Sequence, residues 1–158
     1  MISVLKDNNI PALWLVRKTF LEETNYAAAT KRLRDTHISC PIYFIVSGLK
    51  DNEGMVIERD TNTTNAYYEL SDYMWFLVQT NYDRDGPDPV HDPRRIPVEH
   101  KLAEWGNKDF DEDKLLKAMF QWPTFNIATI FTDIMVPATG YTNTTMWYGY
   151  NPGSAKTA

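Results

Sequence analysis

The chain has 158 residues, of which 43% are hydrophobic and 13% aromatic, and its formal net charge is -5. This length suffices for one ordinary domain with a real core, and the composition excludes a disordered chain. The acidic balance argues against nucleic acid as a partner, because phosphate binding needs a basic face. No unbroken apolar run approaches the ~20 residues of a membrane-spanning helix, so no transmembrane segment is expected.

The first elements expected are two helices. Asn9 and Pro11 make a plausible start for the first helix. The spacing of its apolar residues places three of them on one face: Leu13, Val16 and Phe20. Asn25 can cap a second, Ala-rich helix that runs through Leu33.

Short strands follow, then helices, then strands again. Four segments are rich in β-branched or aromatic residues between Gly, Asn and Asp loops: 42–46, 55–58, 67–70 and 75–80. Helical spacing then relates Val98, Leu102 and Trp105, and again Leu116, Met119 and Phe120. Two last strands are expected at 127–135 and 145–150. This order suits an α+β layered domain.

The most informative segment follows the predicted strand 75–80. A polar run, 79–84, leads into a loop that ends at Asp92-Pro93-Arg94-Arg95. Asn81 is a neutral amide donor of the kind that stabilises an oxyanion, and Arg94 or Arg95 could orient a carboxylate or carbonyl. The structural alternative is that Asn81 caps a turn and the arginines form solvated ion pairs, for example with Asp92.

Four motifs occur in an order that resembles one enzyme family. They occupy residues 43–48, 53–60, 79–84 and 92–95, and weaker similarity extends from 14–17 to 129–132. The chain resembles the acid ceramidase and N-acylethanolamine acid amidase family, relatives of the choloylglycine hydrolases among the N-terminal nucleophile hydrolases. The resemblance implies part of a four-layer α-β-β-α sandwich. It also implies that Asn81 is the oxyanion-hole asparagine and that Arg94, thirteen positions further on, is the active-site arginine.

The nucleophile that the resemblance implies is missing. In the family it is a cysteine that becomes the first residue of the larger subunit after self-cleavage. The one cysteine here, Cys40, is internal, and we interpret it as a small apolar residue at a strand entrance. Residues 1–158 are therefore expected to be the C-terminal portion of the hydrolase, inactive without the upstream half and the small subunit. The rival hypothesis is a truncated, non-catalytic lipid-binding or regulatory relative.

The reaction that the resemblance implies is hydrolysis of a lipid amide. Gln79 and Arg84 look more like acid ceramidase, which favours ceramide and water giving sphingosine and a fatty acid; hydrolysis of N-acylethanolamines is the alternative. Asp85 and Pro93 depart from the family's pattern beside the site. An apolar groove would hold the acyl chain, and Met74 and Trp75 either line it or belong to the core. A lipid-presenting protein is a possible further partner.

No cofactor and no metal are expected. The family uses the amino group of its nucleophile as the base, so His91 on the loop is only a secondary candidate for that role. The acidic residues of the loop lack the spaced ligands of an EF-hand, and the chain has no His-x-x-x-His or Cys-x-x-Cys pattern.

Two acceptor sequons suggest passage through the secretory route. Asn62 and Asn143 each begin an Asn-Thr-Thr triplet, and both are candidate glycosylation sites. Residues 1–7 lack a basic segment followed by a long apolar core, so no signal peptide is expected in this chain. The resemblance implies a lysosomal or secreted protein.

Overall fold

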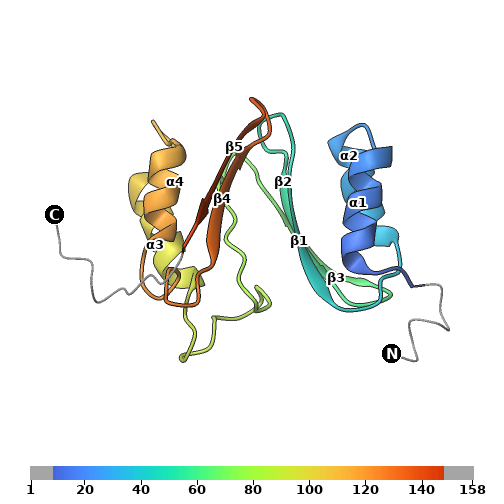
Figure 1. Cartoon of the computed structure of the whole chain (residues 1–158), viewed down its shortest axis with the longest axis horizontal. Coiled ribbons are helices and arrows are strands. Elements are labelled where there is room, and N and C mark those ends of the chain that lie inside the picture. Colours follow the sequence, from blue (N-terminus) through green and yellow to red (C-terminus); the bar gives the residue numbers. More distant parts are fainter. Residues whose placement is uncertain (1–8, 148–158) are drawn as a thin grey trace. The chain divides into compact units, whose positions relative to one another are not determined.

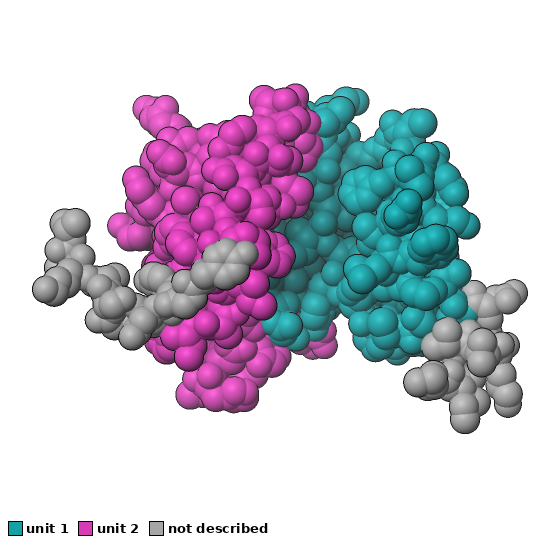
Figure 2. All heavy atoms as spheres, viewed as in Figure 1, with its two compact units in different colours: residues 1–81 teal, residues 82–158 magenta. Residues whose placement is uncertain are grey.

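The chain divides into two compact units, Met1–Asn81 and Tyr82–Ala158 (Figure 2). A computed structural model describes residues 9–147, and each unit combines helices with antiparallel strands (Figure 1). The predicted α+β class is therefore confirmed. The four-layer sandwich stays a prediction.

The first unit contains two helices and a three-stranded sheet: α1 (Ala12–Glu22), α2 (Tyr26–Asp35), β1 (Ile42–Ser47), β2 (Gly54–Arg59) and β3 (Thr64–Glu69). The second unit contains two helices and a hairpin: α3 (Arg95–Trp105), α4 (Glu112–Met119), β4 (Phe131–Val136) and β5 (Tyr141–Met146). None of the helices within residues 9–147 is long and apolar enough to cross a membrane.

Local signals explain the two helices of the first unit. Helix α1 begins directly after Pro11, and Asn25 caps α2 by accepting a hydrogen bond from the backbone N–H of Ala28 at 2.9 Å. The helix positions were predicted correctly. The inward face of α1 was not, since Leu13 and Phe20 are 79% and 81% exposed.

The buried face of α1 includes a polar residue, so a pattern counted on apolar residues alone does not identify this face. Ala12, Leu15 and Thr19 are buried. Thr19 can face inward because its hydroxyl donates to the carbonyl of Leu15 at 2.9 Å, so no polar group is left unsatisfied. The helix is thereby rotated relative to the stripe that spacing alone suggests.

In the first unit α1 and α2 cover one face of the sheet, whose order is β1-β2-β3 (Figure 1). Opposite pairs such as Phe44 and Ile57 point to the helices. The central strand, β2, is buried along its whole length. The core cluster consists of Ala12, Leu15, Leu33, Ile38, Phe44, Met55 and Ile57.

A buried arginine joins the sheet to the end of α2. Arg59 on β2 is 2% exposed and donates to the carbonyl oxygens of Leu33, of Thr36 at 2.7 Å and of Thr63 at 3.0 Å. A cation at a helix C-terminus satisfies carbonyls that have no partner within the helix and interacts favourably with the helix dipole. Burial lowers the pKa of the Arg59 guanidinium, and the negative charge of Asp35 opposes that shift.

In the second unit α3 and α4 lie beside the β4–β5 hairpin (Figure 1). The helical spacing was correct for α3, whose Val98 and Leu102 are buried. Helix α4 begins at the cap residue Asp111, which accepts from the N–H of Lys114 at 2.8 Å. Three aromatic rings pack edge to face beyond α4, with centroids 4.7 to 5.1 Å apart: Phe120, Phe125 and Trp147.

The strand predictions at 42–46 and 55–58 were right, the one at 67–70 was shifted relative to β3, and the others were shifted or wrong. Residues 75–80 form no strand within the part of the chain that is described, although Trp75 and Phe76 pack edge to face at 5.0 Å. Strand composition indicates a half-buried surface, but a strand also needs a neighbour in register. The hairpin lies at Phe131–Val136 and Tyr141–Met146 rather than at 127–135 and 145–150. Residues 148–150 of the last predicted strand lie outside the described range.

Candidate active-site loop

Asn81 is the last residue of the first unit, and Arg94 belongs to the second; each is placed within its own unit. The side chain of Asn81 is exposed. The Tyr43 hydroxyl on β1 donates to the Asn81 carbonyl at 3.5 Å, which is the outer limit of a hydrogen bond. Before it, the Gln79 amide donates to the carbonyl of Thr80 at 2.9 Å. The segment thus presents an amide donor at the surface of its unit.

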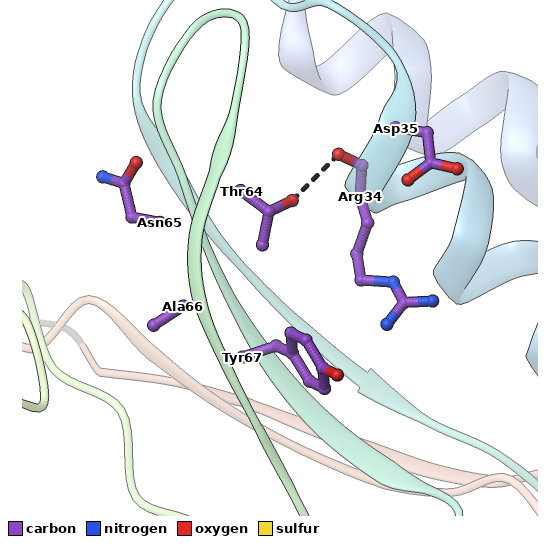
Figure 3. A pocket seen from close by; sticks show the side chains of 6 residues that line it. All are labelled: Arg34, Asp35, Thr64, Asn65, Ala66 and Tyr67. Atoms are coloured by element: carbon purple, nitrogen blue, oxygen red, sulfur yellow. Dashed lines mark hydrogen bonds between the residues drawn. The ribbon is translucent and has the colours of Figure 1, made fainter.

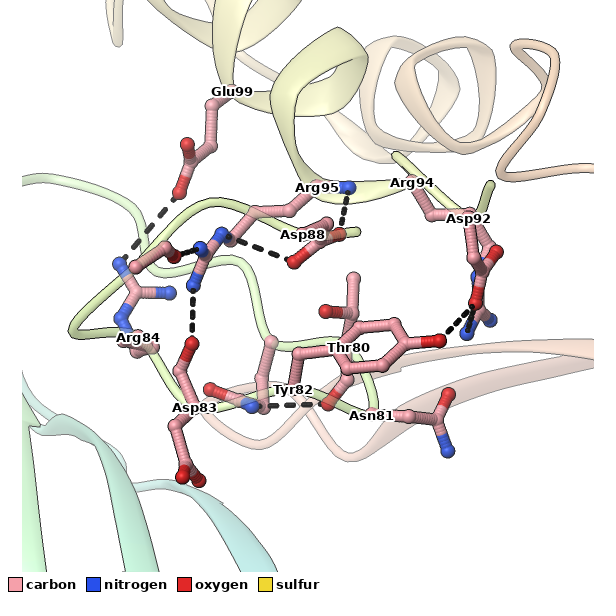
Figure 4. A network of polar contacts seen from close by, with 12 residues as sticks. Thr80, Asn81, Tyr82, Asp83, Arg84, Asp88, Asp92, Arg94, Arg95 and Glu99 are labelled. Carbon is pink, nitrogen blue, oxygen red and sulfur yellow. Dashed lines mark hydrogen bonds and ion pairs between the residues drawn. The ribbon is translucent and has the colours of Figure 1, made fainter. Parts of the chain in front are cut away.

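Arg94 makes a bidentate contact with Asp92 (Figure 4). Its Nε donates to Oδ1 at 2.7 Å and its Nη2 to Oδ2 at 2.9 Å, while the Tyr82 hydroxyl donates to Oδ2 at 3.1 Å. Two parallel hydrogen bonds fix the plane of a guanidinium as well as its position. Arg94 is therefore held in one orientation by the loop that carries it.

The electrostatics of this contact follow from the same hydrogen bonds. Arg94 holds the pKa of Asp92 below its ordinary value; burial opposes this shift and the Tyr82 hydroxyl supports it. Burial, and then the hydrogen bond to the Asp92 carboxylate, raise the pKa of the Tyr82 phenol. Asp92 is consequently an anion at neutral and mildly acidic pH, as the contact with Arg94 requires.

A second contact fixes the backbone of Arg94. The Thr124 hydroxyl, from the segment between α4 and β4, donates to the Arg94 carbonyl at 2.7 Å. Arg94 is the residue immediately before α3, so this bond ties the start of the helix to the following segment. Both the side chain and the main chain of Arg94 are thus fastened within the second unit.

Arg95 is buried, so the alternative of a solvated ion pair does not hold for it. Its side chain is 6% exposed and lies 3.5 Å from the Asp88 carboxylate, measured from Nε to Oδ1. It also donates to the carbonyl of Asp83 at 3.4 Å and to that of Gly86. Arg95 begins α3 and points back into the loop, whereas Arg94 precedes the helix (Figure 4). The two arginines therefore differ in environment although they are neighbours in sequence.

Two of the acidic residues of the loop have arginine partners. Asp88 pairs with Arg95 and Asp92 with Arg94. Within residues 9–147 no group of three His, Cys, Asp or Glu side chains is placed to hold a metal ion. Ion pairing with arginine thus accounts for Asp88 and Asp92.

Other residues singled out by sequence fall in different places. Arg84 lies 3.6 Å from Glu99 on α3 and is 12% exposed, while Asp85 is exposed. His91 is exposed in the turn before Asp92. Cys40 does stand at the entrance of β1, but its side chain is exposed rather than packed as an apolar residue, because it precedes the covered strand.

Both sequon asparagines are exposed. Asn62 lies in the turn between β2 and β3, and Asn143 lies on β5 opposite Ile134. An exposed position is necessary for glycosylation. Attachment of a glycan at either residue stays a prediction.

A pocket of about 400 Å³ opens in the first unit (Figure 3). Its lining consists of Arg34, Asp35, Thr64, Asn65, Ala66 and Tyr67. The Arg34 guanidinium lies 4.9 Å from the centre of the Tyr67 ring, and the Thr64 hydroxyl donates to the Arg34 carbonyl at 2.9 Å. A charged and polar lining does not suit an acyl chain, so this pocket is not the groove that a lipid amide needs.

Sequence reasoning missed three residues that organise the loop. Asp92 was considered only as a solvated partner, and Tyr82 was not considered at all. The role of Asp88 depends on a contact seven positions away with Arg95, for which a single sequence carries no local signal.

Comparisons with known proteins find relatives of two kinds. No protein-family model matches the chain. It is 34% identical over 140 residues to the rat N-acylethanolamine-hydrolyzing acid amidase, covering 87% of this chain and 39% of that protein. It is 33% identical over 124 residues to mouse acid ceramidase, covering 77% of this chain and 32% of that protein. The chain thus spans well under half the length of these relatives.

A solved structure is similar in fold as well. The N-acylethanolamine-hydrolyzing acid amidase (NAAA) ortholog of Caenorhabditis elegans matches with a TM-score of 0.69 and 35% identity, over 78% of this chain and 53% of that one. Agreement in sequence with both kinds of relative, and in fold with the amidase, leads to one assignment. The chain belongs to the acid ceramidase and N-acylethanolamine acid amidase family.

Proposed function

We propose that this chain is the C-terminal portion of an acid ceramidase-like lipid amide hydrolase. The observation that carries the proposal is the similarity over 140 residues to an N-acylethanolamine-hydrolyzing acid amidase. The oriented arginine at the end of the loop supports it, because a guanidinium fixed in one plane suits recognition of a planar polar group.

The reaction is amide hydrolysis by acyl transfer. A cysteine thiolate supplied by the upstream half attacks the lipid amide carbonyl, the amine leaves, and water then releases the fatty acid. Asn81 donates to the tetrahedral oxyanion. Losing one such donor costs about 3 kcal/mol of barrier. The exposed side chain of Asn81 is compatible with a donor that meets a substrate held by another part of the enzyme.

Arg94 steadies the nucleophile and the polar end of the substrate. Asp92 takes two of its donors, Nε and Nη2, and so sets the direction in which the rest of the guanidinium faces. Asp92 and Tyr82 are positioning residues in this scheme, since they act through Arg94.

Ceramide is the favoured substrate. Gln79 and Arg84 look more like acid ceramidase, although the relatives include both enzymes at similar identity. Hydrolysis of N-acylethanolamines is the second candidate reaction. The partners proposed are the nucleophile-bearing upstream half, the small subunit of the same precursor and a lipid-presenting protein, in a lysosomal or secreted setting with glycans at Asn62 and Asn143.

The rival function is non-catalytic. A chain that matches 39% of its relative could act as a lipid-binding or regulatory partner without turnover. The sequence encoded upstream of Met1 distinguishes the two: a Cys followed by an Arg and Asp segment favours the enzyme. Purified residues 1–158 alone are expected to show no hydrolysis above a no-protein control.

The decisive experiment uses the product of the full coding region. Release of fatty acid is measured from ceramide and from an N-acylethanolamine, with self-cleavage followed on gels. Asn81→Ala should lower kcat by roughly a hundredfold or more and leave KM nearly unchanged, because the contact strengthens only in the transition state. Arg94→Lys should also lose most activity, since a point charge cannot replace a planar fork.

The exposed Asp85 provides a matched control in the same loop. Asp85→Asn removes one charge and should leave kcat within about twofold. Near-normal kcat in processed Asn81→Ala enzyme would contradict the role given to Asn81. Absence of turnover with either substrate in the processed wild-type product would favour the non-catalytic alternative.

A further inference from the structure

Asp88 caps helix α3 from outside the helix. The residue in the cap position, Arg94, makes no side-chain cap hydrogen bond. Instead Asp88 Oδ2 accepts from the backbone N–H of Arg95, the first helical residue, at 2.8 Å. A carboxylate at a helix N-terminus satisfies a backbone donor and interacts favourably with the positive end of the helix dipole.

The same carboxylate holds the Arg95 side chain. Asp88 Oδ1 lies 3.5 Å from Arg95 Nε, and the two side chains are 0% and 6% exposed. The remaining guanidinium nitrogens donate to the carbonyls of Asp83 and Gly86 (Figure 4). Arg95 thus contacts three residues of the preceding loop: Asp83, Gly86 and Asp88. A buried pair of this kind is strongly unfavourable to break, because the remaining charge has no water around it.

The contacts between Asp88 and Arg95, called the clamp below, lie directly beside Arg94. Arg94 directly precedes Arg95, and its partner Asp92 belongs to the same loop as Asp88. The bidentate contact between Arg94 and Asp92 joins residues only two positions apart, so it depends on the backbone path between them. Whatever fixes Asp88 and Arg95 therefore limits the conformations open to Arg94.

We propose that the Asp88–Arg95 clamp is a positioning device for Arg94. The clamp closes the loop on the start of α3 and presents Arg94, with Asp92 and Tyr82, in one geometry. The inference rests on the proposed hydrolase function only where it assigns Arg94 a role in binding the nucleophile and substrate. The positioning itself has readouts that require no substrate.

The test uses two resonances of the labelled 158-residue chain in solution. The first is the Nε–H of Arg94, whose hydrogen exchange reports the bond to Asp92. The second is the ring of Tyr82, whose titration reports the neighbourhood of Asp92 because burial and that carboxylate raise the pKa of the phenol. The Nε–H of Arg94 lies outside the clamp, so a purely local defect at Asp88 would not move it. The charge of Asp88 contributes to the raised pKa of the Tyr82 phenol, so the Tyr82 titration is read only in variants that keep this charge. Amides of α3 report whether the helix is intact.

Asp88→Asn and Arg95→Lys each weaken the clamp in a different way. Both should speed exchange of the Arg94 Nε–H by about tenfold. Arg95→Lys, which keeps every charge, should also move the Tyr82 titration to lower pH. Asp85→Asn, which removes an exposed charge from the same loop, should change neither. Unchanged Arg94 exchange in a folded Asp88→Asn protein, or unchanged exchange and titration in a folded Arg95→Lys protein, would overturn the proposal.

A conservative variant keeps the test decisive if Asp88→Asn loses α3. Asp88→Glu retains the charge and alters only the reach of the carboxylate. Altered Arg94 exchange and Tyr82 titration with intact α3 amides would support the clamp, and unaltered values would overturn it. Because neither signal depends on turnover, an inactive full-length product would count against the hydrolase function without affecting this result.

Discussion

Replacing Arg59 should loosen α2 from the sheet of the first unit. Arg59 makes three hydrogen bonds, to the carbonyls of Leu33, Thr36 and Thr63, from a side chain that is almost fully buried. Hydrogen bonds from a charged donor contribute about 1.5–3 kcal/mol each. Together they set an upper limit of about 5–9 kcal/mol for the interaction that Arg59→Met removes.

Part of this interaction is offset in the wild-type protein. Burial of a guanidinium costs several kcal/mol, and the lowered pKa of Arg59 has the same origin. Some of the carbonyls exposed by the substitution will find water. The net loss expected for Arg59→Met is about 3 kcal/mol, and Arg59→Lys should lose less because it keeps the charge.

Native-state hydrogen exchange of α2 and β2 amides measures this loss within the unit concerned. A change of about 3 kcal/mol speeds exchange through local opening by about a hundredfold. Lys31→Met is the control: Lys31 lies on the same helix, its side chain is 71% exposed, and its ion pair with Asp35 should contribute less than about 1 kcal/mol. A loss below about 1 kcal/mol in Arg59→Met, or one equal to the control, would refute this reasoning.

Three further predictions concern a cap, a glycan and a titration. Asn25→Ala should destabilise α2 by about 1 kcal/mol, seen as faster exchange of its first-turn amides; an unchanged rate would contradict the cap. Expression of the chain behind a signal peptide should give a glycosidase-sensitive mass shift that Asn62→Gln reduces, and an unshifted wild-type band would count against glycosylation. The Asp92 carboxyl, followed by carbon NMR, should stay ionised until the pH falls below the ordinary value of 3.8. Since the folded-state pKa of Asp92 is lowered, the contact with Arg94 stabilises the loop above that pH and is lost as the pH falls through the lowered pKa. Tyr82→Phe should raise the midpoint of the Asp92 titration. A midpoint above 3.8 in the wild-type chain would contradict the pairing.

The parts of the fold that sequence predicted correctly depend on short-range signals. The cap at Asn25 and the spacing of Val98 and Leu102 act within a few residues, so residue type and period suffice. The inward face of α1 was wrong because Thr19 is buried through a hydrogen bond within its own helix. A period counted on apolar residues alone cannot register such a position.

The remaining errors arise from contacts distant in sequence. Residues 75–80 have strand composition, but a strand also requires a neighbouring strand in register, which composition does not specify. The burial of Arg95 depends on Asp88 and on main-chain carbonyls of the loop. Arg94 and Arg95 are the same residue type side by side, so only the start of α3 between them determines which one is turned into the loop.

Pro93 was interpreted from the sequence as a departure from the family's pattern, yet its position between Asp92 and Arg94 suits the contact of these two residues. The backbone N–H of Arg94 donates to the Asp92 carbonyl at 3.0 Å, which closes a three-residue turn centred on Pro93. Proline restricts φ to about -65°, close to the value that such a turn requires, and so reduces the entropy lost when the turn forms. The bidentate contact between Asp92 and Arg94 needs that reversal of the chain, since the two residues are only two positions apart. With the clamp at Arg95 on one side and this turn on the other, the loop needs only the single carboxylate of Asp92 to orient Arg94.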